Sequence, residues 1–181
     1  MGKIPEQAKC VFKGEIFEVW QWEQEMYDGS VEIFEKIRRP NTLISIAITD
    51  GRIMIVRDEQ PDRGPKYTLP GGRQEPGESP EEGAKRELLE ETGYEPGSME
   101  LFLEVQPTNK IDWTIYTFIA RDCKKVTEPA PDPGEKIELS PVDFDAFIEI
   151  ILSEEWMETH LQLHVLKMQG DYAEFRKLLG V

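Results

Sequence analysis

The pattern of apolar and polar positions divides the chain into an N-terminal hairpin and a longer region of mixed strands and helices. Residues 11–37 contain short apolar runs on both sides of Asp28-Gly29, a dipeptide that favours a tight hairpin turn. A proline ends this unit. We therefore predict a β-hairpin extension in residues 1–40, ahead of a larger domain in residues 41–181.

Two strands are predicted at the start of the larger domain. The run "TLISIAIT" is continuously apolar and rich in β-branched residues, which indicates a strand buried on both faces. An Asp50-Gly51 turn separates it from a second apolar run, "RIMIVRDE". The segment "QPDRGPKYT" follows, and its prolines and glycine predict a loop.

A helix is predicted for residues 79–92. Ser79 is a good N-cap, Pro80 suits the first helical position, and Glu82 completes a Ser-x-x-Glu capping box. Gly93 suits the left-handed position that commonly ends a helix. Both ends of this helix are therefore marked by local chemistry.

The remainder of the chain predicts further strands and C-terminal helices. The runs "MELFLEVQPT" and "WTIYTFIARDC" indicate strands, and "TEPAPDPGEK" indicates a loop. "IELSPVDFDAFIEIIL" predicts a short strand and then a helix capped at Ser140, and residues 153–179 show helical periodicity broken near Gly170. This order of elements predicts an α/β or α+β fold in which a mixed sheet lies between helical layers.

The composition is that of a soluble globular protein with a strong negative charge. The 181 residues suffice for one domain with a small appendage. Lys and Arg number 21 and Asp and Glu number 36, so the net charge of −15 argues against nonspecific binding to nucleic acid or anionic membranes. No apolar run approaches the roughly 20 residues that a membrane helix needs. We therefore expect neither a nucleic-acid nor a membrane partner.

The cysteines and histidines do not indicate a metal site. Cys10 and Cys123 lie far apart in no metal-binding spacing, so we expect two reduced thiols in a cytoplasmic protein. Residues 1–9 are polar and do not resemble a signal peptide. His160 and His164 have a spacing that can bind zinc, but no catalytic glutamate lies between them. We expect these histidines to pack or to lie on a helix surface.

Three glutamates lie where local physics opposes negative charge. Glu87, Glu90 and Glu91 are near the C-terminal end of the predicted helix, where the helix dipole is negative. A turn of about 100° per residue brings all three within roughly a 100° arc, and like charges at this spacing cost a few tenths of a kcal/mol per pair. The cluster is either a solvated acidic face or a site for Mg²⁺, which prefers oxygen ligands.

Two neighbouring features bear on that choice. Arg86 lies four residues from both Glu82 and Glu90, so an ion pair with either offsets part of the repulsion. Gly71 and Gly72 precede the helix and let the backbone pass close to it, where a carbonyl oxygen can serve as a further metal ligand.

These residues together resemble the signature of a known family. Gly72 is followed after five residues by Glu78, and after seven more by the run "RELLEETGY" that begins at Arg86. This spacing resembles the Nudix box, with Tyr94 at a position where an aliphatic residue is commoner. The order of elements from about residue 42 to residue 152 also resembles the α/β/α sandwich of the Nudix hydrolases.

The resemblance implies a hydrolase that uses Mg²⁺ or Mn²⁺ to cleave a nucleoside diphosphate linked to another group. It implies that Glu87 and Glu91 are the main metal ligands, that Glu90 is a ligand or a nearby charge, and that the Gly72 carbonyl completes the site. It further implies that Glu78 supports the ligands or binds outside them, and that Arg86 forms a structural ion pair.

Features outside the box resemble the branch that hydrolyses ADP-ribose and nucleotide sugars. In "PDPGEKIEL", Glu135 matches the position of a catalytic glutamate, with Glu138 three residues further on. The extra hairpin resembles the element with which that branch dimerises and lines the partner's site. Trp20 and Trp22 share one strand face there and would either pack at an interface or stack on a base.

One segment departs from the pattern of that branch. An arginine usually precedes the box in a pattern such as "QYRP", whereas this chain has "VRDEQPDRG". Arg57 and Arg63 flank the position and would substitute as phosphate ligands. This departure leaves open a nucleotide sugar other than ADP-ribose.

We therefore predict a cytoplasmic, homodimeric hydrolase of the pyrophosphate bond in ADP-ribose or a related nucleotide sugar. The alternatives are a house-cleaning nucleoside triphosphate pyrophosphohydrolase, an RNA-end pyrophosphohydrolase, and a non-catalytic regulator that binds nucleotide sugars. The hairpin and Glu135 count against the first, and the net charge counts against the second. A regulator usually loses the acids of the box, and this chain keeps them.

Overall fold

The computed structural model describes residues 3–130, 134 and 136–181. The strands are β1 (Lys9–Lys13), β2 (Glu18–Glu25), β3 (Val31–Arg38), β4 (Thr42–Thr49), β5 (Arg52–Gln60), β6 (Arg63–Thr68), β7 (Gly71–Arg73), β8 (Tyr94–Glu95), β9 (Ser98–Val105), β10 (Ile111–Asp112), β11 (Ile115–Arg121), β12 (Lys124–Lys125) and β13 (Lys136–Val142). The helices are α1 (Pro80–Thr92), α2 (Phe144–Ile151), α3 (Thr159–Leu166) and α4 (Ala173–Leu179).

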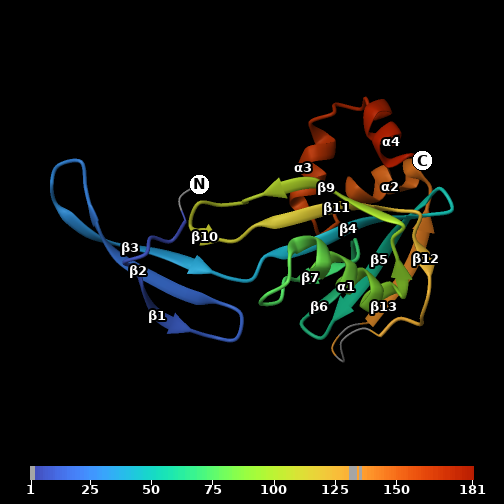
Figure 1. The fold of residues 1–181 in the computed structure, drawn as a ribbon. Helices are drawn as coiled ribbons and strands as arrows, with labels where there is room; N and C mark the ends of the chain where they lie inside the picture. The colour runs from blue at the N-terminus through green and yellow to red at the C-terminus, as the bar shows by residue number, and fades with distance from the viewer. Residues whose placement is uncertain (1–2, 131–133, 135) are drawn as a thin grey trace.

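A mixed sheet between two helical layers forms the core (Figure 1). Its strand order is β13-β5-β4-β11-β9, with β6 beside β5 and β7 beside β4. β4 and β11 are parallel, and the other neighbours are antiparallel. Alternate residues of β4 explain the two layers, because Ile44 and Ile46 pack in the cluster that contains helices α2, α3 and α4, whereas Leu43 and Ala47 pack with α1. The predicted α/β/α sandwich, with a central strand buried on both faces, is confirmed.

The N-terminal extension is a second sheet that projects from the core (Figure 1). Its order is β1-β2-β3-β10, and the β2–β3 hairpin turns at Asp28-Gly29 as predicted. Gly29 has φ 81°, and the Asp28 carboxylate accepts the Ser30 backbone N–H at 3.0 Å. The structure adds two strands to the hairpin, since β1 separates from β2 near Gly14 and β10 pairs with β3 in parallel. The boundary at residue 40 remains a prediction.

Helix α1 has the predicted ends. The Ser79 hydroxyl accepts the Glu82 N–H at 3.2 Å, and the Glu82 carboxylate accepts the Ser79 N–H at 2.8 Å, which completes the capping box. Gly93 ends the helix at φ 75°. The break near Gly170 is also confirmed, because this residue lies between α3 and α4 with φ 89°.

Two local predictions are wrong. The segment after β5 was predicted as a loop but forms β6, which pairs with β5 across a tight turn. The cap of α2 is Asp143, whose carboxylate accepts the Ala146 N–H at 2.9 Å, and not Ser140. Ser140 and Pro141 instead belong to β13, and a proline is tolerated there because β13 is an edge strand of the sheet.

The two histidines contact side chains of the core sheet, and the two cysteines are not bonded to each other. The His160 ring nitrogen Nε2 lies 2.9 Å from the Thr117 hydroxyl, and the His164 ring meets Phe102 edge-on at 5.2 Å, in agreement with the expected packing role. Both cysteines are free thiols, and burial raises the pKa of Cys123 to about 11. Among the described helices, none has the length and apolar character needed to cross a bilayer.

Candidate functional site

The site begins where β7 passes the C-terminal half of α1. Gly71 and Gly72 pair with Ile44 and Leu43 of the central strand β4. A Cβ atom on Gly72 would lie 2.5 Å from the carboxylate of Glu87, which would then have to shift. A Cβ atom on Gly71 would lie 2.1 Å from the backbone oxygen of Leu43, so glycine is required at that position. The strand thus brings its backbone directly against the acidic part of the helix.

Glu91 is tied to the same strand. Its Oε2 accepts the backbone N–H of Gly71 at 2.9 Å, and the side chain is partly buried. The β7 backbone therefore forms a hydrogen bond with Glu91. The Glu87 carboxylate lies beside Gly72, where a side chain would otherwise be. This arrangement places a backbone segment and two carboxylates at one location, as the box resemblance implied.

Arg86 is the centre of the charged contacts. Its guanidinium donates to Glu78 at 2.9 Å, to Glu87 at 2.9 Å and to Glu90 at 3.0 Å. It also donates to the backbone carbonyl of Arg73 at 3.0 Å. The predicted pairing with Glu90 is confirmed, whereas Glu82 caps the helix instead.

These contacts change the protonation of the partners. Hydrogen bonding to Glu78 is the main reason that the pKa of Arg86 is raised, and hydrogen bonding to Arg86 lowers the pKa of Glu78. The Glu87 and Glu78 side chains are only 15% and 16% exposed, compared with 48% for Glu90. Charged carboxylates at such burial require compensation, and Arg86 supplies it.

The donor set has the chemistry that a hard divalent cation needs. Glu87, Glu90 and Glu91 offer carboxylate oxygens, and the β7 backbone passes close to Glu87 and Glu91. Within the described ranges, no group of three or more His, Cys, Asp or Glu side chains is arranged so that it could hold a metal ion.

The other predicted residues lie apart from this cluster. Arg57 and Glu138 are cross-strand neighbours on β5 and β13, with 3.8 Å between Nη1 and Oε2. Arg63 is bonded to Asp58, through both its carboxylate and its backbone carbonyl. Glu135 lies outside the described residues.

Trp20 and Trp22 lie on one face of the N-terminal sheet, as predicted. The Arg38 guanidinium stacks over Trp20 at 4.5 Å, and Trp22 meets Phe34 edge-on at 6.0 Å. Both indoles are half-buried by these neighbours within the single chain. The extension that carries them projects away from α1 (Figure 1).

A second basic group lies near the box and is not indicated by any motif of the sequence. Arg39 is half-buried, stacks over Trp113 at 4.6 Å and donates to the Thr42 hydroxyl at 3.4 Å. Thr42 is paired with Arg73 of β7. Burial, and then the positive charge of Arg73, lower the pKa of Arg39. In the sequence, Arg39 is marked only by its position shortly before the apolar run that forms β4.

Arg39 opens on a cleft of about 530 Å³ between the extension and the box loop. Its lining has the basic residues Lys13 and Arg38 and the acidic residues Glu15, Glu18, Glu75 and Asp112. This volume is within the usual range for small-molecule sites. Among described residues, Arg39 has no carboxylate within ion-pair distance, so its charge is available to an anion in the cleft.

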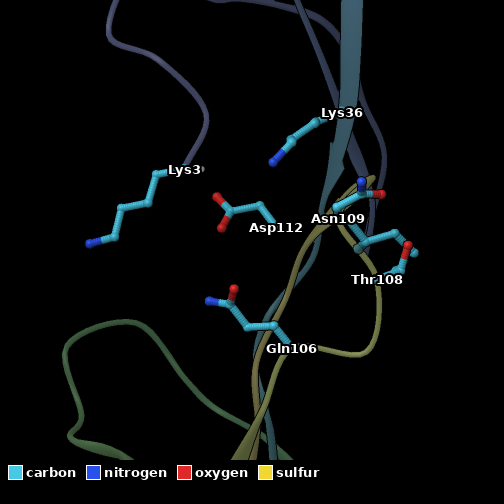
Figure 2. A pocket seen from close by; sticks show the side chains of 7 residues that line it. Lys3, Lys36, Gln106, Thr108, Asn109 and Asp112 are labelled. Atoms are coloured by element: carbon cyan, nitrogen blue, oxygen red, sulfur yellow. The ribbon is translucent and has the colours of Figure 1, made fainter. Parts of the chain in front are cut away.

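A second, polar pocket lies on the extension side, between Lys36 and Asp112 (Figure 2). Lys3, Gln106, Thr108 and Asn109 also line it. Its volume is about 10 Å³, which is room for about one water molecule. This pocket is therefore too small to hold a nucleotide.

Comparison with known proteins agrees with the geometry. The model of the NUDIX domain matches residues 38–163. A methanol dehydrogenase activator from Bacillus methanolicus is 28% identical over 159 residues, which cover 83% of this chain and 86% of that protein. An ADP-ribose pyrophosphatase from Bacillus subtilis (strain 168) is 26% identical over 149 residues, 80% of each chain.

Two further similarities concern the fold and a short segment. A solved structure described as an ADP compounds hydrolase has a TM-score of 0.73 at 18% identity and covers 91% of this chain and 93% of its own, which confirms the fold. A putative 8-oxo-dGTP diphosphatase from Bacillus subtilis (strain 168) is 70% identical over 30 residues, 17% of this chain and 20% of that protein. The domain match over residues 38–163 shows that this chain belongs to the Nudix family and is a Nudix hydrolase.

Proposed function

We propose that this chain hydrolyses the pyrophosphate bond of ADP-ribose or a related nucleoside diphosphate sugar. The products would be a nucleoside monophosphate and a sugar phosphate. The observation that carries the proposal is the contact of Gly71 and Gly72 with Glu91 and Glu87 at the end of α1. The similarity to the ADP-ribose pyrophosphatase of Bacillus subtilis supports this substrate class.

The carboxylates of Glu87, Glu90 and Glu91 and the carbonyl of Gly72 would hold Mg²⁺, or Mn²⁺ in its place. When bound, the cation would neutralise charge on the pyrophosphate and acidify a water molecule. Glu78 and Arg86 would keep the ligands in position, since their ion pair joins the loop after β7 to α1. Oxygen ligands are the type that both cations accept.

Glu135 would act as the general base. In the proposed step, it takes a proton from the attacking water while the water oxygen bonds to one phosphorus. The bond from that phosphorus to the bridging oxygen breaks, and the second phosphate leaves with the bridging oxygen. A general base must come within hydrogen-bond distance of the water whose proton it takes.

The substrate's phosphates would bind in the cleft beside the box. Arg39 supplies a half-buried guanidinium held in place by Trp113, and Arg73 adds a second positive charge. Two cations in this position would offset the repulsion that a protein of net charge −15 exerts on an anion. Arg57 and Arg63 already have carboxylate neighbours, in Glu138 and Asp58, so Arg39 is the stronger candidate for the missing arginine.

The extension would form a homodimer interface. Val31 and Ile33 are 58% and 61% exposed and share a sheet face with Phe12, which is 58% exposed. Glu23 and Glu25, the cross-strand neighbours of Ile33 and Val31, lie on the same face, and in the described part of the chain no helix packs on this sheet. A second copy would bury this face, and Trp20 and Trp22 lie on the opposite one. Both free thiols suit a cytoplasmic dimer.

The function is tested directly by measuring the nucleoside monophosphate and sugar phosphate formed from a panel of nucleotide sugars, with and without Mg²⁺. Glu91→Gln should lower kcat by orders of magnitude and leave the fold intact, because the amide oxygen can still accept the Gly71 N–H while the negative charge is lost. Glu81→Gln, at the exposed start of the same helix, is the matched control. Near-wild-type turnover by Glu91→Gln would remove Glu91 from the metal site, and metal-independent binding without turnover would favour a regulator.

Arg39→Leu should raise KM by about tenfold or more with a smaller effect on kcat. A hydrogen bond to a charged group contributes about 1.5–3 kcal/mol, and 1.4 kcal/mol is tenfold in affinity. Steady-state kinetics on the best substrate of the panel measure both constants. Arg52→Leu, an exposed arginine at the start of β5, should leave KM unchanged. An unchanged KM in Arg39→Leu would exclude the phosphate-binding role.

Light scattering after gel filtration tests the dimer. The wild-type chain of 20.9 kDa should elute with twice that mass, and Ile33→Glu should elute as a monomer because it places a charge on the apolar face. Glu32→Gln changes the opposite face of the same strand and should remain dimeric. A monomeric wild type, or a dimeric Ile33→Glu, would rule out this interface.

A further inference from the structure

A carboxylate outside the acidic cluster is buried next to the strand that leads to it. Glu158 directly precedes α3 and is 8% exposed. One of its oxygens accepts the hydroxyl of Thr68, the last residue of β6. The other oxygen, Oε2, is buried and has no hydrogen-bond partner among the residues that the structure describes. Buried carboxylate oxygens are normally satisfied, so this arrangement requires an explanation.

The backbone around Glu158 is joined to β6 on both sides. The Tyr67 N–H donates to the Glu155 carbonyl at 2.9 Å, and the Met157 N–H donates to the Tyr67 carbonyl at 3.0 Å. The Trp156 indole N–H donates to the Glu158 carbonyl at 3.0 Å. These bonds give Glu158 a defined position, so its contact with Thr68 is held by the surrounding structure.

The strand after Thr68 leads directly to the candidate metal site. Leu69 is buried in the core, and the Pro70 carbonyl accepts the Ser45 N–H at 2.8 Å. The next two residues are Gly71, whose N–H holds Glu91, and Gly72, which faces the Glu87 carboxylate. Four consecutive residues therefore connect the Glu158 contact to the acidic end of α1.

A purely structural role does not account for Glu158. Burial raises its pKa to about 7, which the Thr68 hydroxyl, the backbone N–H groups of Glu158 and Leu69 and the charge of Arg63 only partly offset. Arg63 is itself bonded to Asp58, and burial lowers the pKa of the neighbouring His160 to about 4, which leaves it neutral. Among the described residues, the charged form of Glu158 thus has no full counter-ion, and apolar side chains in place of buried charges are often neutral or stabilising.

We propose that Glu158 is a positioning residue for the metal site. By bonding Thr68, it fixes the path of residues 69–72 and so sets where Gly71 and Gly72 meet Glu91 and Glu87. The proposal rests on the proposed function, because it assumes that these residues hold a divalent cation. It assigns no contact with substrate to Glu158.

Binding of Mn²⁺ to the substrate-free protein, followed by the electron paramagnetic resonance of free Mn²⁺, tests the proposal. Glu158→Leu removes both the charge and the acceptor and should weaken Mn²⁺ binding roughly tenfold, the usual scale for residues that orient metal ligands. Glu158→Gln keeps an oxygen that can accept from Thr68 and should restore most of the affinity. Glu155→Gln, an exposed acid of the same segment, should match the wild type.

Thermal unfolding of the same proteins separates positioning from stability. The folded pKa of Glu158 lies above its unfolded value of about 4.5, so the folded protein binds more protons and loses stability as pH rises towards 7. Glu158→Leu should lose this pH dependence and show a Tm at pH 8 no lower than that of the wild type. Weaker metal binding without lower stability is an outcome that a structural role would not produce.

A folded Glu158→Leu that binds Mn²⁺ as tightly as the wild type would overturn the positioning role. If that variant does not fold, Thr68→Val serves as the second test, because it removes the hydroxyl and keeps the shape; unchanged Mn²⁺ binding in Thr68→Val would equally overturn the proposal. A wild-type protein that binds no Mn²⁺ would instead overturn the metal site itself and the positioning role with it.

Discussion

The Arg86 guanidinium is the counter-ion on which the geometry of the site depends. It bonds Glu78, Glu87 and Glu90, and it also bonds the carbonyl of Arg73. Repulsion between acids one turn apart and the adverse helix dipole each cost a few tenths of a kcal/mol. Hydrogen bonds to charged groups contribute about 1.5–3 kcal/mol each where they are shielded, as at Glu78 and Glu87, and less at the more exposed Glu90. The contacts of Arg86 therefore outweigh these costs and allow the acids to gather.

The same contacts connect the helix to the sheet. Arg86 and Glu78 join the loop after β7 to α1, while Gly71 bonds Glu91 from the strand side. β7 in turn pairs with β4, the strand that is buried on both faces. The acidic end of α1 is therefore attached to a strand at the centre of the core, and a ligand set of fixed geometry needs such support.

Local chemistry explains which parts of the fold were predictable. Three features could be predicted because they depend only on residues that are close in sequence. They are the capping box at Ser79 and Glu82, the helix end at Gly93 and the turn at Asp28-Gly29. β6 was missed because its residues are polar and proline-containing, and its strand character comes from pairing with β5. Tertiary pairing overrides propensity at such positions.

The site shows the same division. Glu87, Glu90 and Glu91 were identified from helix geometry, and Glu78 only from the resemblance to the Nudix box. Arg39 and Glu158 were missed because their partners are distant in sequence. Trp113 is brought to Arg39, and Thr68 to Glu158, only by the folded chain. No local pattern distinguishes either residue from an ordinary surface charge.

Amide hydrogen exchange along α1, with and without Mg²⁺, is the most direct measurement of the central claim that the acidic helix end is a metal site. The first turn, beginning at Ser79, provides an internal reference because its acids are placed favourably for the dipole. The account predicts that Mg²⁺ slows exchange in residues 87–93 and leaves the first turn unchanged. Equal exchange at the acidic end with and without Mg²⁺ would contradict it.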